Sequence, residues 1–204
     1  MGENLLKDPY NIIIAGVGGQ GNVTASRVLG NMLIRNYFVT IGETFGASQR
    51  GGSVMSHVRV SAQSIWSPQI PERKADLIAA LEPAEALRVT TVYGHKGSHI
   101  VVNTRPVYPA GVAAGELEYP SLEEIKKALS SITEHVWFVK ATDTALQLGN
   151  PILGNMVILG VVAGLDVLPI GEEDFEWGIS RIFSEDKVAL NVKALEMGIN
   201  LIRE

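Results

Sequence analysis

The stretch Tyr10–Gly21, YNIIIAGVGGQG, is an apolar run that ends in a glycine-rich loop. The β-branched run over residues 10–15 predicts a buried strand. Apolar residues at helical spacing follow over 22–35, and the run 38–41 (FVTI) predicts a second strand. A strand, a glycine turn, a helix and a strand within about 30 residues form a βαβ unit. Its right-handed crossover predicts that the two strands are parallel.

The remainder of the chain continues this alternation of strands and helices. Strands are predicted over 54–60, 76–81, 98–103 and 136–139, and helices over 83–87, 121–132, 142–149, 152–165 and from 184 onward. The strand at 54–60 alternates apolar with polar residues, which predicts one wetter face near a sheet edge. Ser121 and Glu124 have the spacing of a capping box, and Thr142 is expected to cap the helix that follows it.

These patterns predict an α/β fold, a Rossmann-like three-layer domain with a mostly parallel sheet. The part from about residue 150 is expected to be helical, and residues 1–204 are expected to form one domain. Gly160 and Gly164 lie four residues apart on one face of an apolar helix. They are expected to let another backbone approach closely.

Composition excludes several classes of function. Hydrophobic residues make up 46% of the 204 residues, which is enough for a sizeable core. The net charge of −5 argues against a nucleic-acid partner. With no cysteine, the chain forms no disulfide and lacks the usual ligands of iron–sulfur clusters. The apolar stretch 152–165 is shorter than the roughly 20 residues of a membrane span, and residues 1–8 lack the pattern of a signal peptide. A cytoplasmic protein without a membrane partner is therefore expected.

The glycine loop is the first candidate binding element. Gly16, Gly18 and Gly21, with Gly19 and Gln20 between them, would let a phosphate approach the free N–H groups at a helix start. Two other interpretations stay open for this loop. It is also compatible with a tight turn that holds no ligand, or with NAD binding.

Glu43 bears on the NAD interpretation. It stands about 20 residues beyond the loop, where a dinucleotide fold places its ribose-binding carboxylate. Against NAD binding, Gln20 departs from the usual small residues of such loops. The segment after Glu43 also does not resemble an adenine pocket.

The second candidate element is the stretch 42–53, GETFGASQRGGS. It begins where the second strand is expected to end, and ligands of open α/β sheets bind outside the carboxyl ends of strands. Arg50 offers a guanidinium fork for phosphate or carboxylate. Gly51 and Gly52 permit close approach of a ligand, whereas Ser48 and Gln49 supply hydrogen-bond donors. The alternative interpretation is a structural loop with a solvated arginine.

Motifs of self-contained catalysts are missing from the sequence. It has no phosphate-binding loop of the nucleotide triphosphatases, no His and Glu cluster with zinc spacing and no nucleophile elbow. No catalytic residue and no metal site are therefore assigned. His57 and Arg59 alternate on one strand face, and either a place in the crevice or a half-exposed pair is compatible with that pattern.

Four stretches together resemble the gamma-type domain of 2-oxoacid:ferredoxin oxidoreductases. They are GVGGQG at 16–21, FGASQRGGSV at 45–54 with SHVR at 56–59, GNP at 149–151 with NMV at 155–157, and NVKA at 191–194 followed by Gly198. The similarity spans most of the chain. Within the family it is greatest to the beta subunit of indolepyruvate ferredoxin oxidoreductases, which consists of this domain alone.

The resemblance implies a function that is shared between subunits. The whole enzyme would convert a 2-oxoacid such as indolepyruvate to acyl-CoA and CO2 on thiamine diphosphate, and would reduce ferredoxin through [4Fe-4S] clusters. Both cofactors would lie on a larger partner subunit, because this chain has neither a thiamine motif nor cysteines. The gamma-type domain would complete the active site and contact coenzyme A, with Asn155 adding a hydrogen bond. Two alternatives stay open: a stand-alone NAD-binding oxidoreductase, and a purely structural subunit whose glycines only permit close packing.

Overall fold

A six-stranded mixed sheet forms the centre of the computed structural model, which describes residues 5–45 and 52–203. The strands are β1 (Tyr10–Val17), β2 (Phe38–Phe45), β3 (Ser53–Ser61), β4 (Leu77–Ala80), β5 (His99–Asn103) and β6 (Val136–Val139). Their order across the sheet is β2-β3-β1-β4-β5-β6. The helices are α1 (Asn22–Leu33), α2 (Pro83–Tyr93), α3 (Ala110–Ala113), α4 (Leu122–Ser130), α5 (Ala141–Leu146), η1 (Pro151–Leu153), α6 (Gly154–Gly164), α7 (Glu172–Ser180) and α8 (Glu185–Arg203).

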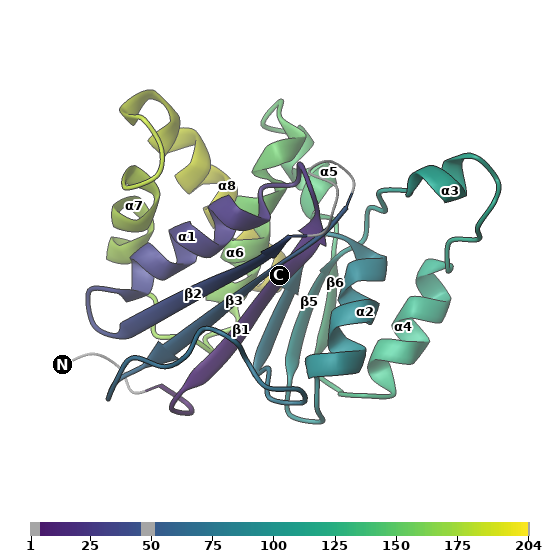
Figure 1. Cartoon of the computed structure of the whole chain (residues 1–204). Coiled ribbons are helices and arrows are strands. Elements are labelled where there is room, and N and C mark those ends of the chain that lie inside the picture. The colour runs from purple at the N-terminus through teal and green to yellow at the C-terminus, as the bar shows by residue number, and fades with distance from the viewer. Residues whose placement is uncertain (1–4, 46–51, 204) are drawn as a thin grey trace.

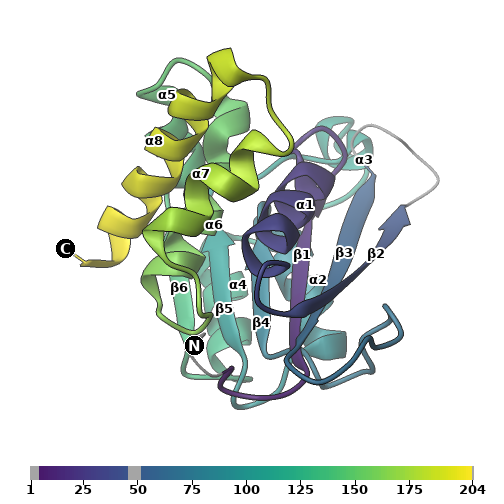
Figure 2. The ribbon, with the colours of Figure 1, turned by 90° about the vertical axis from the view of Figure 1, so that its left-hand side faces the viewer.

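Helices cover both faces of this sheet, as the three-layer prediction requires (Figure 1). One apolar cluster joins the sheet to α1, α6, α7 and α8, and a second joins the other face to α2 and α4. Figure 2 shows α1, α6, α7 and α8 together on one side of the strands. The α/β class and the predominance of parallel strands are confirmed, and after β6 the described chain contains helices alone.

The position of β3 corrects the sequence prediction. β3 pairs antiparallel with β1 on one side and with β2 on the other, so it is an interior strand and β2 forms the edge. All its residues except Ser53 are buried. The alternating polar residues do not mark a wet face, because His57 and Arg59 bond the segment 62–71 that covers them. β1 and β2 do run in the same direction, but β3 separates them.

Local signals predicted the helix starts with mixed success. The capping box is confirmed, since Glu124 N donates to Ser121 Oγ and Ser121 N donates to Glu124 Oε2. The expected cap at Thr142 is wrong, because α5 begins one residue earlier and the Thr142 hydroxyl accepts a hydrogen bond from Asn103 Nδ2. Helices α3 and α7 were not predicted.

The close approach expected at the glycines of α6 is confirmed against α8. A Cβ on Gly160 would lie 1.8 Å from the Leu195 carbonyl oxygen, and one on Gly198 would lie 2.0 Å from the Val157 carbonyl oxygen. Gly164 is less tightly confined, with its nearest neighbours at 3.3 Å. The two helix backbones therefore meet at Gly160 and Gly198.

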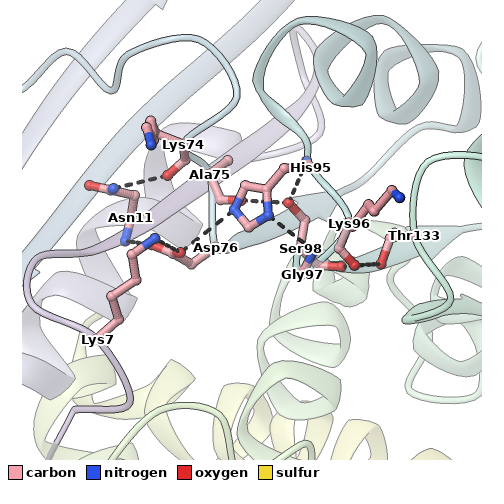
Figure 3. A network of polar contacts seen from close by, with 10 residues as sticks. All are labelled: Lys7, Asn11, Lys74, Ala75, Asp76, His95, Lys96, Gly97, Ser98 and Thr133. Carbon is pink, nitrogen blue, oxygen red and sulfur yellow. Dashed lines mark hydrogen bonds and ion pairs between the residues drawn. The ribbon is translucent and has the colours of Figure 1, made fainter.

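A polar network fixes the amino ends of the central strands (Figure 3). The buried carboxylate of Asp76 accepts hydrogen bonds from Lys7 Nζ at 2.7 Å and from the Asn11 backbone N–H at 2.8 Å. His95 N donates to Ser98 Oγ, which in turn donates to a backbone carbonyl just before Asp76. This network lies at the opposite end of the sheet from the glycine loop, because Asn11 lies near the start of β1 and the loop follows the end of β1.

No helix of the described residues is long and apolar enough to cross a membrane.

Candidate functional site

The glycine loop connects β1 to α1 and needs glycine at two positions for its backbone. Gly19 has φ +104° and Gly21 has φ +81°, a region that favours glycine. Gly21 is the N-cap of α1; no side chain caps this helix and its first turn carries no acidic residue. The N-terminus of α1 therefore keeps the partial positive charge that attracts anions.

Gly16 and Gln20 organise the loop from within. The Gln20 side chain accepts a hydrogen bond from Val17 N at 2.9 Å and donates one to the Leu81 carbonyl at 2.8 Å. A Cβ on Gly16 would lie 2.7 Å from Gln20 Oε1 and 2.6 Å from Asn22 Oδ1. Gly16 is thus required by the loop's own side chains. The glutamine that breaks the dinucleotide pattern joins the loop to the end of β4.

Asn155 contacts the glycine loop from the start of α6. Its Nδ2 donates to the Gly21 carbonyl at 3.3 Å, and its Oδ1 accepts from Met156 N at 2.7 Å. A Cβ on Gly21 would lie 2.4 Å from Asn155 Nδ2. The structure therefore brings together two predicted site residues that are 134 positions apart in the sequence.

A pocket of about 260 Å³ opens beside this loop, at the carboxyl ends of β1, β4 and β5. Its walls come from the segments after β1, β4 and β5 and from the chain leading into α6. The lining residues are Gly19, Gln20, Leu81, Asn103, Arg105, Pro106, Val107, Thr142, Asn150, Pro151, Ile152, Gly154 and Asn155. The chain crosses from β1 to one half of the sheet and from β4 to the other, so the pocket lies at the switch point where α/β folds bind ligands. No carboxylate, histidine or lysine is among these lining residues. Its walls suit an anion and offer no acid or base for catalysis.

Arg105 is the lining residue that sequence reasoning missed. Its Nη1 lies 3.3 Å from Asp143 Oδ1, and both side chains are more than half exposed, at 56% and 53%. The signal was available, because Arg105 stands two residues beyond the predicted strand 98–103, on the edge where ligands bind. It supplies the positive charge of the described pocket wall.

The second candidate element is placed only in part. Gly18 N donates to the Gly52 carbonyl at 2.8 Å, so the end of this element meets the glycine loop. Ser48, Gln49, Arg50 and Gly51 lie outside the described residues.

Glu43 lies within β2, which continues to Phe45. It pairs with Arg27, at 3.4 Å between Nε and Oε1, and is not among the residues that line the pocket. β3 separates β2 from β1, so Glu43 does not lie on the strand next to the glycine loop, where a dinucleotide fold places its ribose-binding carboxylate.

A buried carboxylate anchors the segment beyond Arg105. Glu82, 1% exposed, accepts hydrogen bonds from the backbone N–H of Glu85 and of Val107 and from the Tyr119 hydroxyl. Burial and this carboxylate raise the pKa of Tyr119, so its hydroxyl keeps its proton. Hydrogen bonds to Glu82 therefore fix Val107 and Tyr119 beside the start of α2.

His57 and Arg59 do not line the pocket. Arg59 donates to Asn11 Oδ1 and to the Ser67 carbonyl, and His57 Nδ1 accepts from Ile70 N at 3.2 Å. Burial, with a smaller contribution from Arg59, lowers the pKa of His57. Of the two interpretations that the sequence left open, the structure supports neither a crevice position nor a half-exposed pair, because both residues are buried.

The chain is similar to known proteins over nearly its whole length. The family model described as pyruvate ferredoxin/flavodoxin oxidoreductase matches residues 11–201. The indolepyruvate oxidoreductase subunit IorB of Archaeoglobus fulgidus is 40% identical over 191 residues, which are 93% of this chain and 94% of that protein. The protein of the same name from Thermococcus kodakarensis is 36% identical over 197 residues, 96% of each chain.

Solved structures share the fold at lower identity. The gamma subunit of a keto/oxoacid ferredoxin oxidoreductase from Geobacter sulfurreducens superposes with a TM-score of 0.68 at 21% identity, covering 95% of this chain and 98% of that one. A 2-oxoglutarate:ferredoxin oxidoreductase from Magnetococcus marinus, solved with 2-oxoglutarate, coenzyme A and succinyl-CoA bound, gives a TM-score of 0.71 at 23% identity. That likeness covers 97% of this chain and 31% of the longer one. Because the family match spans residues 11–201 and the relatives match over nearly their full length, the chain belongs to the pyruvate ferredoxin/flavodoxin oxidoreductase family.

Proposed function

We propose that this chain is the coenzyme A-binding small subunit of a thiamine-dependent 2-oxoacid:ferredoxin oxidoreductase. A larger partner subunit carries thiamine diphosphate and the [4Fe-4S] clusters. The assembled enzyme converts a 2-oxoacid such as indolepyruvate and coenzyme A to acyl-CoA and CO2, and two electrons pass to ferredoxin. This chain completes the active site by binding the coenzyme.

The pocket beside the glycine loop is the observation that carries this proposal. Its lining includes Gly19, which has open space where a side chain would stand, and the glycine loop leads into the start of α1, which has no side-chain cap. A phosphate placed there meets backbone N–H groups and the positive end of the helix dipole. Asn155 holds the loop in place, and Ser48, Gln49, Arg50, Gly51 and Gly52 would approach the same ligand from the second element.

The absence of a catalytic group in the described pocket wall supports a binding role. Its polar side chains are amides, one hydroxyl and one guanidinium, and the Thr142 hydroxyl is already bonded to Asn103. None of these groups exchanges a proton readily near neutral pH. Chemistry on the oxo group is therefore assigned to the partner, whose thiamine diphosphate would supply it.

Similar proteins support the assignment of the coenzyme and the substrate. The Magnetococcus structure holds coenzyme A and succinyl-CoA, and the domain that matches this chain is about a third of that longer protein. The IorB relatives carry indolepyruvate in their name. Indolepyruvate is accordingly the 2-oxoacid that we would test first.

Steady-state kinetics of the assembled enzyme test the proposal. Arg50→Ala is expected to raise the apparent KM for coenzyme A while the KM for the 2-oxoacid stays the same. Arg181→Ala is the matched control, because Arg181 stacks on Trp177 at the end of α7. An unchanged KM for coenzyme A in an intact complex with Arg50→Ala would remove Arg50 from the site. Quenching of intrinsic fluorescence by NADH, but not by coenzyme A, would favour the NAD-binding alternative.

A further inference from the structure

We propose that Arg105 binds the ribose 3′-phosphate of coenzyme A, and that it exchanges Asp143 for this phosphate when the ligand enters. The inference rests on the proposed function and assigns a specificity-determining residue to the same pocket. The glycine loop would hold the pyrophosphate, so the two phosphate-bearing parts of the ligand meet different walls.

The contacts of Arg105 leave it available to a ligand. Both side chains of its ion pair with Asp143 are exposed to solvent, and exposed ion pairs contribute little to the stability of a fold. Its charge is not offset elsewhere in the pocket, since the described lining residues include no carboxylate. A phosphate dianion offers the guanidinium a charge-assisted, two-pronged contact that a single 3.3 Å bond to Asp143 does not provide.

The backbone on both sides of Arg105 is fixed. Thr104 N donates to the Val139 carbonyl at 2.9 Å, and Val107 N donates to the buried Glu82 carboxylate at 3.2 Å. Asn103, two residues before Arg105, donates hydrogen bonds from its side chain to the Leu81 carbonyl and to the Thr142 hydroxyl. The guanidinium can therefore change partners by a side-chain rotation while its stem stays in the pocket wall.

Two different anion-binding elements in one pocket favour a ligand with two separated phosphate groups. Helix starts with glycine loops typically take a pyrophosphate through backbone N–H groups, and a side-chain arginine typically takes a phosphate on the ribose. Coenzyme A carries both groups. A ligand with a single phosphate would leave one of the two elements unused.

The test compares Arg105→Ala and Asp143→Asn in the assembled enzyme, with coenzyme A and with 3′-dephospho-coenzyme A. Loss of a charged hydrogen bond predicts a KM for coenzyme A that is roughly tenfold higher in Arg105→Ala. Asp143→Asn is expected to lower this KM about two- to threefold, because it removes the competing partner of Arg105 and one negative charge. With 3′-dephospho-coenzyme A, the difference between wild type and Arg105→Ala is expected to disappear. Lys126→Ala, which breaks an exposed ion pair with Glu123 on α4, is the matched control and is expected to change neither KM.

If Arg105 binds the ligand, the KM for coenzyme A rises in Arg105→Ala and falls in Asp143→Asn, and these opposite changes distinguish ligand binding from a structural ion pair. A structural pair would make Arg105→Ala and Asp143→Asn change the KM in the same direction, and that result overturns the inference. A tenfold effect that persists with 3′-dephospho-coenzyme A also overturns it. If Arg105→Ala fails to assemble, Arg105→Gln preserves the length of the side chain without its charge and is expected to show the same tenfold effect.

The outcome also separates this inference from the proposed function. If Arg50→Ala raises the KM for coenzyme A and Arg105→Ala does not, the inference fails and the proposed function stands. If neither variant changes that KM, coenzyme A does not bind at this pocket and both fail.

Discussion

Replacing Gly160 with alanine tests whether direct backbone contact joins α6 to α8. The new Cβ would lie 1.8 Å from the Leu195 carbonyl oxygen, where real Cβ atoms essentially never come closer than 3.0 Å. Raising that separation requires the two helices to move apart by about 1.2 Å, given these two distances. The contact atom belongs to the backbone, so no side-chain rotation relieves the clash.

The predicted cost follows from overpacking in a buried seam. Such changes cost about 1–3 kcal/mol and occasionally more, and the rigid carbonyl places Gly160→Ala at about 3 kcal/mol. In a chain of this length, each kcal/mol lowers the Tm by roughly 2–4 °C. The expected decrease in Tm is therefore about 6–12 °C, by the same scaling.

Gly164→Ala is the matched control on the same helix. Its Cβ would meet the Ile199 backbone at 3.3 Å, a distance that a shift of a few tenths of an ångström relieves. The gain in helix propensity, up to about 1 kcal/mol, offsets that adjustment. Urea unfolding of the purified chain, followed by circular dichroism, gives the free energy of unfolding for both variants. If Gly160→Ala and Gly164→Ala agree within about 1 kcal/mol, the reasoning about overpacking is refuted.

The same seam predicts non-additivity. A Cβ on Gly198 would lie 2.0 Å from the Val157 carbonyl oxygen, so Gly198→Ala forces the same separation of α6 and α8. Once the helices have moved apart, the second alanine meets less resistance. The double variant is therefore expected to lose less free energy of unfolding than the two single variants together.

Three further substitutions test other contacts. Gln20→Ala removes the partner of two backbone groups at the glycine loop and is expected to lower the free energy of unfolding by about 2 kcal/mol in urea titrations. Tyr119→Phe removes a donor to the buried Glu82 carboxylate; a loss of about 1–3 kcal/mol is expected, and a loss near zero would show that other donors suffice. The pKa of His57 is depressed in the fold by burial and by Arg59, so the unfolded state binds the proton more tightly. The stabilisation from neutral His57 is therefore complete above the pKa of about 6.5 that His57 has in the unfolded chain, and it is lost as the pH falls towards the lower pKa of the folded state. His57→Gln should flatten this part of a plot of the free energy of unfolding against pH.

Local sequence patterns predicted most of the elements around the site. The β-branched run before Gly16 and the helical spacing after Gly21 predicted β1, the glycine turn and α1, because backbone propensity and periodicity act over a few residues. The same local logic predicted the capping box at Ser121. It failed for Thr142, whose hydroxyl bonds a residue 39 positions away instead of capping a helix.

The pocket itself depends on contacts that no local pattern encodes. Asn155 reaches Gly21 across 134 positions, and Gln20 reaches Leu81 across 61. The position of Arg105 just beyond the strand 98–103 is visible in the sequence, but only the packing of β5 beside β4 places this residue in the pocket wall.

The sequence by itself determined the α/β class, the glycine turn between β1 and α1, and the exclusion of cysteine-ligated clusters, because composition and short-range periodicity suffice for each. Tertiary structure decided that β3 lies between β1 and β2, since strand pairing joins residues such as Ile14 and Ser56 that are distant in the chain. It also decided why two glycines are required: Gly16 leaves room for the side chains of its own loop, and Gly160 meets the backbone of α8. Both requirements are steric: Gly160 meets a distant helix, and Gln20 is held beside Gly16 by the Leu81 carbonyl 61 positions away, so both contacts exist only after the chain has folded.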